Sequence, residues 1–221
     1  DEQMTEAWRM VFTIYQDPVM REKQFNQTSN NNSLRIFWHY MTQIVSPIHM
    51  HTSMFTKSIK FLASEEQAKR WLPLINNLNI IGCYAQTEMG HGSNVAGIET
   101  TAKLDLKTNE YVLHTPSIKA YKFWPGALGR HSTHAVVFAR LLVEENDYGV
   151  LPFMIPIRSR KDHMPFPGIN VGDIGAKFGY DTMDNGFLAF DQYRVPADAL
   201  LKRFVDVNKE GDFELKGDPR A

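Results

Sequence analysis

Apolar side chains in the first third of the chain recur at helical spacing. Residues 3–16 place them three and four positions apart, which predicts an amphipathic helix. Residues 34–45 are apolar or aromatic on most sides and predict a buried helix, and another helix is expected through residues 55–62. Ser64 and Gln67 have the spacing of a capping box, which predicts that a further helix begins there.

From about residue 80 the apolar pattern takes the period of strands. Short apolar or alternating runs bounded by turn residues predict strands at 80–85, 101–105, 111–114, 135–143, 150–157 and 186–190. The turn spacing suits an antiparallel barrel or sandwich, and helices followed by strands indicate an α+β fold. We therefore predict a helical N-terminal domain over residues 1–79, a central β domain over 80–200 and a connecting tail over 201–221.

Composition and charge exclude several classes of protein. The 24 basic and 25 acidic residues leave a net charge of −1, which argues against nucleic-acid binding. No run reaches the roughly 18 apolar residues that a membrane span needs. The single cysteine, Cys83, excludes an internal disulfide framework and favours an intracellular setting. Because the chain begins at Asp1 without a signal peptide and ends in a turn-like tail, we expect it to be a fragment.

A glycine-bearing loop follows the first predicted strand. It runs from Tyr84 to Asn94 and carries Gln86, Thr87 and Ser93. Glycines let a backbone pass close to a ligand, and amide and hydroxyl groups can hold the polar edge of a cofactor or a phosphate. The loop lacks the third glycine of a dinucleotide-binding fingerprint and the Gly-Lys-Ser/Thr ending of a phosphate loop. A strand turn with no ligand remains the alternative.

A second loop places two large aromatic residues beside a turn. Phe123 and Trp124 are followed directly by Pro125 and Gly126. The face of a tryptophan binds planar rings well, so Trp124 is a candidate for contact with a ring system. The alternative is a core tryptophan at the end of a strand.

Other reactive residue types give no site. The histidine pairs and Glu88 have no third ligand at metal-binding spacing, so we predict no metal centre. Cys83 lies in an apolar strand and is expected to be an inert buried thiol.

The two loops resemble a known family. Residues 84–93 read Tyr-Ala-Gln-Thr-Glu-Met-Gly-His-Gly-Ser and are similar to the signature of the flavin-dependent acyl-CoA oxidases, the peroxisomal relatives of the acyl-CoA dehydrogenases. The dehydrogenases have Pro-Gly-Ala-Gly in place of Met-Gly-His-Gly. Residues 66–73 resemble the family's segment before that motif, and further similar segments follow in the family's order at 124–126, 172–180, 183–186 and 194–196. The resemblance covers nearly the whole chain and is firmest from about residue 60 to 200.

The resemblance implies a three-domain fold of which this chain holds two domains. A helical N-terminal domain and a central β domain are present, whereas the C-terminal helical domain is expected to be absent. In the family, FAD lies between the β domain and the C-terminal helices, and its adenine end reaches a second subunit. The resemblance therefore implies a homodimer or a larger assembly, located in the peroxisome.

Specific residues follow from matching this sequence to the family's motifs. FAD contacts are expected from Tyr84, Gln86, Thr87, Trp124 and Gly126. Gly92 and Ser93 are expected to contact the acyl-CoA substrate, with the pyrophosphate of FAD as the alternative for Ser93. No catalytic residue is assigned, because the family's base is a glutamate on the C-terminal domain.

The implied reaction is oxidation of acyl-CoA to trans-2-enoyl-CoA, with electrons passed to oxygen to give hydrogen peroxide, as in fatty acid β-oxidation. The chain alone is expected to be inactive. An acyl-CoA dehydrogenase is one alternative. The other is a non-catalytic accessory or structural subunit derived from the family.

Overall fold

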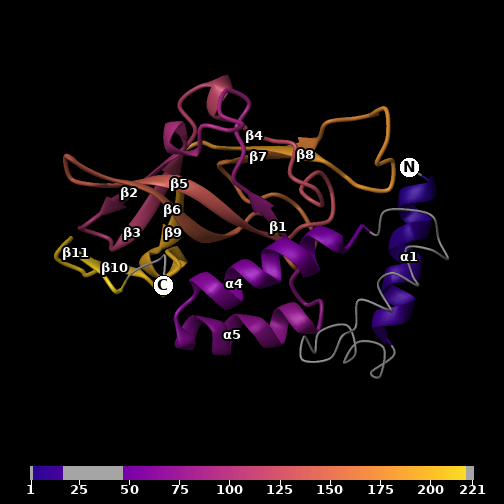
Figure 1. The fold of residues 1–221 in the computed structure, drawn as a ribbon, viewed down its shortest axis with the longest axis horizontal. Helices are drawn as coiled ribbons and strands as arrows, with labels where there is room; N and C mark the ends of the chain where they lie inside the picture. The colour runs from indigo at the N-terminus through magenta and orange to yellow at the C-terminus, as the bar shows by residue number, and fades with distance from the viewer. Residues whose placement is uncertain (1, 17–46, 218–221) are drawn as a thin grey trace.

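Helices occupy one side of the molecule and strands the other. The computed structural model describes residues 2–16 and 47–217 (Figure 1). The helical part consists of α1 (Glu2–Gln16), the π-helical turn η1 (His51–Phe55), α4 (Thr56–Leu62) and α5 (Glu65–Asn76). The helix expected over 34–45 lies outside the described residues.

The capping box begins α5 as predicted. The Ser64 hydroxyl accepts a hydrogen bond from the Gln67 backbone N–H at 3.2 Å, and the Gln67 side chain accepts one from the Ser64 N–H at 3.0 Å. These two bonds satisfy amide donors that every helix start leaves open. The helix continues through Pro73 and ends at Asn76.

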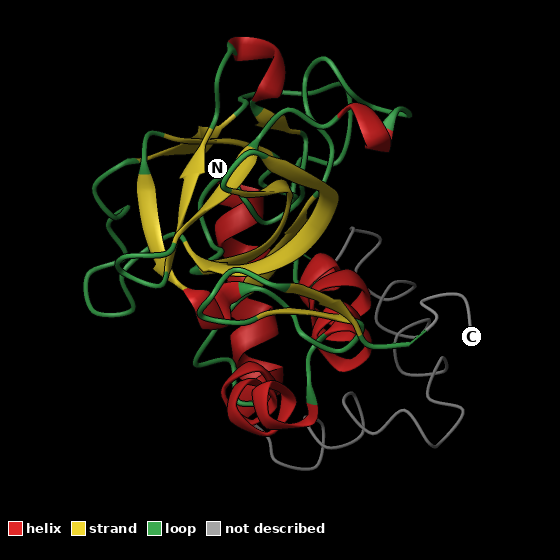
Figure 2. Cartoon of the chain, turned by 90° about the vertical axis from the view of Figure 1, so that its left-hand side faces the viewer, coloured by secondary structure: helices red, strands yellow, loops and turns green. Residues whose placement is uncertain are grey.

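The strands of the described residues form three sheets. Their bounds are β1 (Gly82–Ala85), β2 (Thr101–Asp105), β3 (Glu110–His114), β4 (Lys122–Phe123), β5 (His134–Val143), β6 (Asn146–Pro156), β7 (Ile169–Asp173), β8 (Gly186–Phe190), β9 (Tyr193–Pro196), β10 (Val205–Val207) and β11 (Phe213–Leu215). The largest sheet has the order β1-β5-β2-β3-β9, with β6 also paired to β5. The others are β4-β8-β7 and β10-β11. Figure 2 shows the strands curled around a common interior, with helices beneath them.

The α+β class and the order of helices before strands are confirmed, but the expectation of an antiparallel sheet is wrong at two pairings. Strands β1 and β2 both pair with β5 in parallel. A parallel pair needs a long crossover connection, whereas turn spacing along a sequence reveals only hairpins. The chain between β1 and β5 contains β2, β3 and β4, so this pairing leaves no local signal.

Three hydrophobic cores hold the described residues together. The largest lies inside the curled sheets, where Tyr111 and Phe153 meet edge to face at 5.1 Å between ring centroids. A second packs Phe55 and Ile59 against Val136 and Met154 of the sheet. The helices therefore cover one face of the β5–β6 pair. A third, smaller one groups Trp8 of α1 with Ile81, which directly precedes β1.

A glycine lets β1 approach the helices closely. A Cβ on Gly82 would lie 2.3 Å from the ring of Phe55, which is far inside van der Waals contact. Any other residue at position 82 would push β1 away from η1. Since the first candidate loop leaves the other end of β1, this packing fixes where that loop begins.

The end of the described chain folds back onto the β domain. Strands β10 and β11 pair as an antiparallel hairpin, and Phe213 stacks on Tyr148 at 4.5 Å between ring centroids. The domain boundaries at 79/80 and 200/201 remain predictions. Among the described residues, no helix is long and apolar enough to cross a membrane.

Candidate functional site

The structure brings the two candidate loops side by side. The Phe123 N–H donates to the Thr87 carbonyl at 3.0 Å, and the Met89 N–H donates to the Tyr121 carbonyl at 3.0 Å. Thr87 and Trp124 are therefore carried by neighbouring extended segments, although they lie far apart in sequence. Thr87 is exposed at this junction.

A buried ion pair joins the loops beneath this surface. The Lys122 ammonium is fully buried and lies 2.9 Å from a carboxylate oxygen of Glu88. It also donates to the Gln86 carbonyl at 3.1 Å and the Phe138 carbonyl at 2.7 Å. All three ammonium protons therefore have acceptors, one of them in the first loop's backbone. Burial lowers the pKa of Lys122 to about 8, although Glu88 opposes this shift.

Glu88 is committed to structural contacts. Its carboxylate accepts hydrogen bonds from the backbone N–H groups of Glu99 and Thr100 at 2.9 and 3.0 Å. His91 Nδ1 lies 2.9 Å from Glu88 Oε2, the same oxygen that accepts from the Glu99 N–H. Burial raises the pKa of Glu88, but Lys122 and the amide donors outweigh it, so the net pKa lies below the usual range. Both oxygens are occupied, and Glu88 is held as a carboxylate that fixes the loop.

Trp124 is presented at the surface rather than buried. Its side chain is 53% exposed, which excludes the alternative of a core tryptophan at a strand end. Its backbone has a φ of +84°, a region that bulky residues rarely adopt. The ring therefore has an open face at the junction of the two loops.

Tyr84 and Gln86 form a small polar group at the end of β1. The Tyr84 hydroxyl donates to the Gln86 side-chain oxygen at 2.9 Å. The Tyr84 ring also contacts Phe138, with centroids 5.1 Å apart. Burial raises the pKa of Tyr84, so its hydroxyl stays a proton donor at neutral pH.

Gly126 lies under the Trp124 turn in a tightly packed position. A Cβ there would lie 2.7 Å from the Met183 sulfur and 2.8 Å from Met50 Cγ. A larger residue at this position would require these methionine side chains to shift. Contact between Gly126 and a cofactor remains a prediction.

Gly92 and Ser93 are exposed at the tip of the first loop. Nothing lies within 4 Å of a Cβ built on Gly92. The 3-10 turn η2 (Val95–Gly97) follows, capped by the Asn94 side chain, which accepts from the Gly97 N–H at 3.2 Å. The geometry leaves both residues free to meet a ligand, and their proposed contact with substrate remains a prediction.

The role of Lys122 was not predicted from the sequence. Because most lysines are exposed, a lysine beside aromatic residues at a loop is expected to have a solvated side chain. Its position between Tyr121 and Phe123 in a short strand was the available signal. Cys83, by contrast, is fully buried as expected, and burial raises its pKa to about 12.

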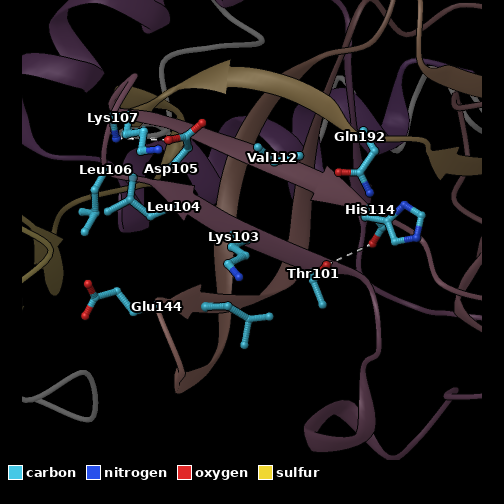
Figure 3. A pocket seen from close by; sticks show the side chains of 11 residues that line it. Thr101, Lys103, Leu104, Asp105, Leu106, Lys107, Val112, His114, Glu144 and Gln192 are labelled. Carbon is cyan, nitrogen blue, oxygen red and sulfur yellow. Dashed lines mark hydrogen bonds between the residues drawn. The ribbon is translucent and has the colours of Figure 1, made fainter.

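The structure also contains a surface cavity over the largest sheet (Figure 3). It has a volume of about 470 Å³ and opens over β2, β3 and the end of β5. Its lining residues are Thr101, Lys103, Leu104, Asp105, Leu106, Lys107, Val112, His114, Leu142, Glu144 and Gln192. None of the predicted site residues lines it. Within residues 2–16 and 47–217, no three His, Cys, Asp or Glu side chains gather as a metal ion would need.

Comparison with known proteins gives matches over most of the chain. Residues 1–81 match the family described as acyl-coenzyme A oxidase N-terminal, and residues 83–193 match the acyl-CoA dehydrogenase middle domain. Peroxisomal acyl-coenzyme A oxidase 1 of Arabidopsis thaliana is 54% identical over 169 residues, which cover 75% of this chain and 26% of that protein. The rat protein of the same name is 44% identical over 174 residues, covering 79% of this chain and 26% of its own length.

Solved structures agree with these matches. Acyl-CoA oxidase-1 of Caenorhabditis elegans, complexed with FAD and ATP, has a TM-score of 0.90 and 39% identity, covering 98% of this chain and 32% of its own. Acyl-CoA oxidase-2 of the same organism, bound with FAD, ascaroside-CoA and ATP, also has a TM-score of 0.90, with 37% identity, and covers 98% of this chain and 32% of its own. This chain thus spans about a quarter of the length of the curated relatives it matches.

Proposed function

This chain belongs to the acyl-CoA oxidase family, and we propose that it forms the flavin-facing part of an oxidase of acyl-CoA thioesters. The proposed reaction converts acyl-CoA to trans-2-enoyl-CoA and produces hydrogen peroxide from oxygen. The relatives' names support a place in the peroxisome. A homodimer or a larger assembly is also part of the proposal.

The observation that carries the proposal is the exposed Trp124 ring beside the exposed Thr87. A planar ring can lie on an indole face, and a hydroxyl beside it can bond to polar atoms on the ring's edge. These two groups are held together by the Phe123–Thr87 backbone bond. The residues therefore fit FAD, which the C. elegans acyl-CoA oxidase-1 structure contains.

FAD would supply the redox chemistry, accepting a hydride from the acyl chain. The protein's own groups orient and bind: Trp124 would receive the ring, Thr87 and Gln86 its polar edge, and Tyr84 would hold the Gln86 side chain. Gly92 and Ser93 at the loop tip would meet the CoA-bearing substrate. The ascaroside-CoA bound by C. elegans acyl-CoA oxidase-2 supports a CoA thioester as the ligand class.

Proton abstraction is not assigned to a described residue. A general base needs a carboxylate oxygen free to reach the substrate. Glu88 is the carboxylate nearest in sequence to the proposed flavin contacts, and its oxygens bind Lys122 and backbone amides. We propose that the base lies outside the described residues.

A dehydrogenase is the second candidate, supported by the match of residues 83–193 to the dehydrogenase middle domain. The oxidase is favoured because the curated relatives described above are oxidases with identities up to 54%. The two differ in their acceptor: only an oxidase passes the electrons directly to oxygen.

The proposal is tested by FAD titration of the full-length gene product, followed by flavin absorbance. Trp124→Ala is expected to weaken FAD binding by about tenfold, since aromatic contacts are worth roughly 0.5–1.5 kcal/mol beyond their buried area. Phe61→Ala is the matched control, because Phe61 is also an exposed aromatic residue but lies on α4. A folded wild-type protein that binds no FAD would contradict the proposal.

A further inference from the structure

The Trp124 turn has a strained backbone. Trp124 has a φ of +84° and Ala127, in the same turn, has a φ of +65°. This conformation is energetically unfavourable for residues with a Cβ, and it persists only where surrounding contacts enforce it. Something in the structure must therefore hold Trp124 in place.

Residues 185 and 186 supply the contacts that do so. The Trp124 N–H donates to the Gly186 carbonyl at 3.0 Å, and the Gly186 N–H donates to the Pro125 carbonyl at 3.1 Å. The Asn185 side-chain amide donates to the Trp124 carbonyl at 2.6 Å. Both backbone polar groups of Trp124 are thus bound, while its indole is left exposed.

Asn185 is itself rigidly held. Its side chain is almost fully buried, and its backbone N–H donates to the Met183 carbonyl at 3.0 Å. The Ile174 N–H donates to the Asn185 carbonyl, also at 3.0 Å. A Cβ on Gly186 would lie 2.5 Å from the Gly129 nitrogen, so the neighbouring segments leave no room for a shift. These contacts hold the backbone of Asn185. Its side-chain nitrogen is directed by the bond to the Trp124 carbonyl, while its side-chain oxygen is buried without a hydrogen-bond partner among the described residues.

We propose that Asn185 is a positioning residue for the cofactor: its side-chain amide holds the Trp124 carbonyl, enforces the positive φ and thereby sets the orientation in which the indole receives the flavin. This inference rests on the proposed function for the identity of the ring that Trp124 faces. The enforcement of the turn rests on the geometry alone.

A positioning role makes a prediction that a purely structural role does not. If Asn185 only stabilised the fold, Asn185→Ala would lower stability and leave the Trp124 ring unchanged. If it positions Trp124, the ring must become more mobile, and the fraction of molecules competent to bind flavin must fall. When that fraction drops to about a tenth, the apparent dissociation constant for FAD rises about tenfold.

The first experiment measures Trp124 directly. The fluorescence of each protein minus that of its Trp124→Phe counterpart isolates the Trp124 signal from the other three tryptophans. Asn185→Ala is expected to increase acrylamide quenching of this signal and to raise the FAD dissociation constant about tenfold. Asn170→Ala is the matched control, because Asn170 is exposed on β7, which pairs with β8. Unchanged quenching in the Asn185 variant would overturn the proposal.

The second experiment tests the strain. Glycine adopts a positive φ without strain, so a Trp124→Gly protein needs no enforcement of the turn. Asn185→Ala is therefore expected to lower the free energy of unfolding less in the Trp124→Gly background than in the wild type. Equal effects in the two backgrounds would overturn the proposal.

Two further measurements keep the outcomes separate. Asn185→Asp keeps the side chain's size but removes the donor, and it serves where the alanine variant does not fold. In the wild type, slow hydrogen exchange of the Asn185 side-chain amide is expected, and fast exchange would overturn the proposal. If wild type and variant both fail to bind FAD while Trp124 quenching changes, the proposed function fails and the positioning role stands.

Discussion

At the scale of single residues, the buried ammonium of Lys122 connects the two candidate loops through its hydrogen bonds. It is buried, and its three donors reach the first loop, strand β5 and Glu88. A buried pair of this kind adds little net stability compared with apolar residues, but removing one partner leaves a buried charge uncompensated. Its value here is that it specifies how the two loops meet.

We expect Lys122→Met to lower the free energy of unfolding by about 3–5 kcal/mol, because Glu88 would be left buried and unpaired. The Lys122→Met, Glu88→Gln double variant should recover part of that loss, since it removes the stranded charge. Urea unfolding followed by circular dichroism measures both. Lys103→Met, at an exposed lysine on β2, is the control and should change little. A single variant as stable as the control would refute the connector role.

The pH dependence of stability should reflect His51. Its Nδ1 accepts from the Gly82 N–H at 3.0 Å, and its Nε2 lies 3.3 Å from the Ile75 carbonyl. Burial lowers its pKa to about 4, against an ordinary value of 6.5. The unfolded chain thus binds more protons between these values, so stability falls as pH drops from about 6.5 to about 4.

This shift corresponds to about 3 kcal/mol, and His134, whose pKa burial also lowers to about 4, acts in the same direction. We expect His51→Asn, which keeps an acceptor for the Gly82 N–H, to flatten the decline measured by urea unfolding from pH 7 to pH 4. If the free energy of unfolding falls equally with pH in the wild type and the variant, His51 is excluded as a source of the acid sensitivity.

At the scale of elements, Gln67 connects the helical part to the β domain. Its side-chain oxygen accepts from the backbone N–H groups of Ser64 and Lys202, both at 3.0 Å. Its amide donates to the carbonyls of Leu200 at 2.7 Å and Asp198 at 3.0 Å. One side chain therefore caps α5 and ties it to the segment after β9.

Loss of this side chain should cost more than loss of the cap alone. We expect Ser64→Ala to lower the free energy of unfolding by about 1 kcal/mol. Gln67→Ala should lower it by about 3 kcal/mol, since it leaves several buried backbone groups unpaired. Thermal and urea unfolding of the two variants provide the comparison. Equal losses would mean that the contacts to residues 198–202 add nothing.

Elements with local signals were predictable from the sequence, and those that depend on distant partners were not. The start of α5 follows from two residues three apart, and β2 and β3 follow from alternation and a turn. The parallel pairing of β1 with β5 has no local signature, so strand direction was missed. The candidate loops were found by their residue types and by family resemblance. Their contact through Lys122, and the clamp by Asn185, depend on segments that meet only in the folded chain.

At the scale of the whole molecule, the chain carries the proposed binding groups for flavin and substrate, and no base is assigned among the described residues. We expect the 221-residue protein to produce no peroxide from acyl-CoA, because Glu88 is occupied and acid–base assistance is worth about 10²–10⁴-fold. A peroxide-coupled assay with saturating FAD and acyl-CoAs of short, medium and long chain tests this. Glu99→Gln is the informative variant if activity appears, since the Glu99 side chain is 43% exposed near His91. Turnover abolished by that change would place the base within this chain.

The parallel pairing of β1 with β5 also dictates an order of events in time. Strands β5 and β6 are joined by two residues, so they can pair on the microsecond timescale of β-hairpin formation. Strand β1 must wait for the closure of a much longer loop, and on the ribosome it is synthesised well before its partner emerges. Pulse-labelled hydrogen exchange during refolding should therefore protect the β5–β6 amides first and those of Gly82–Ala85 later. The loop that follows β1, which carries the proposed flavin contacts, would be among the last parts of the molecule to take shape.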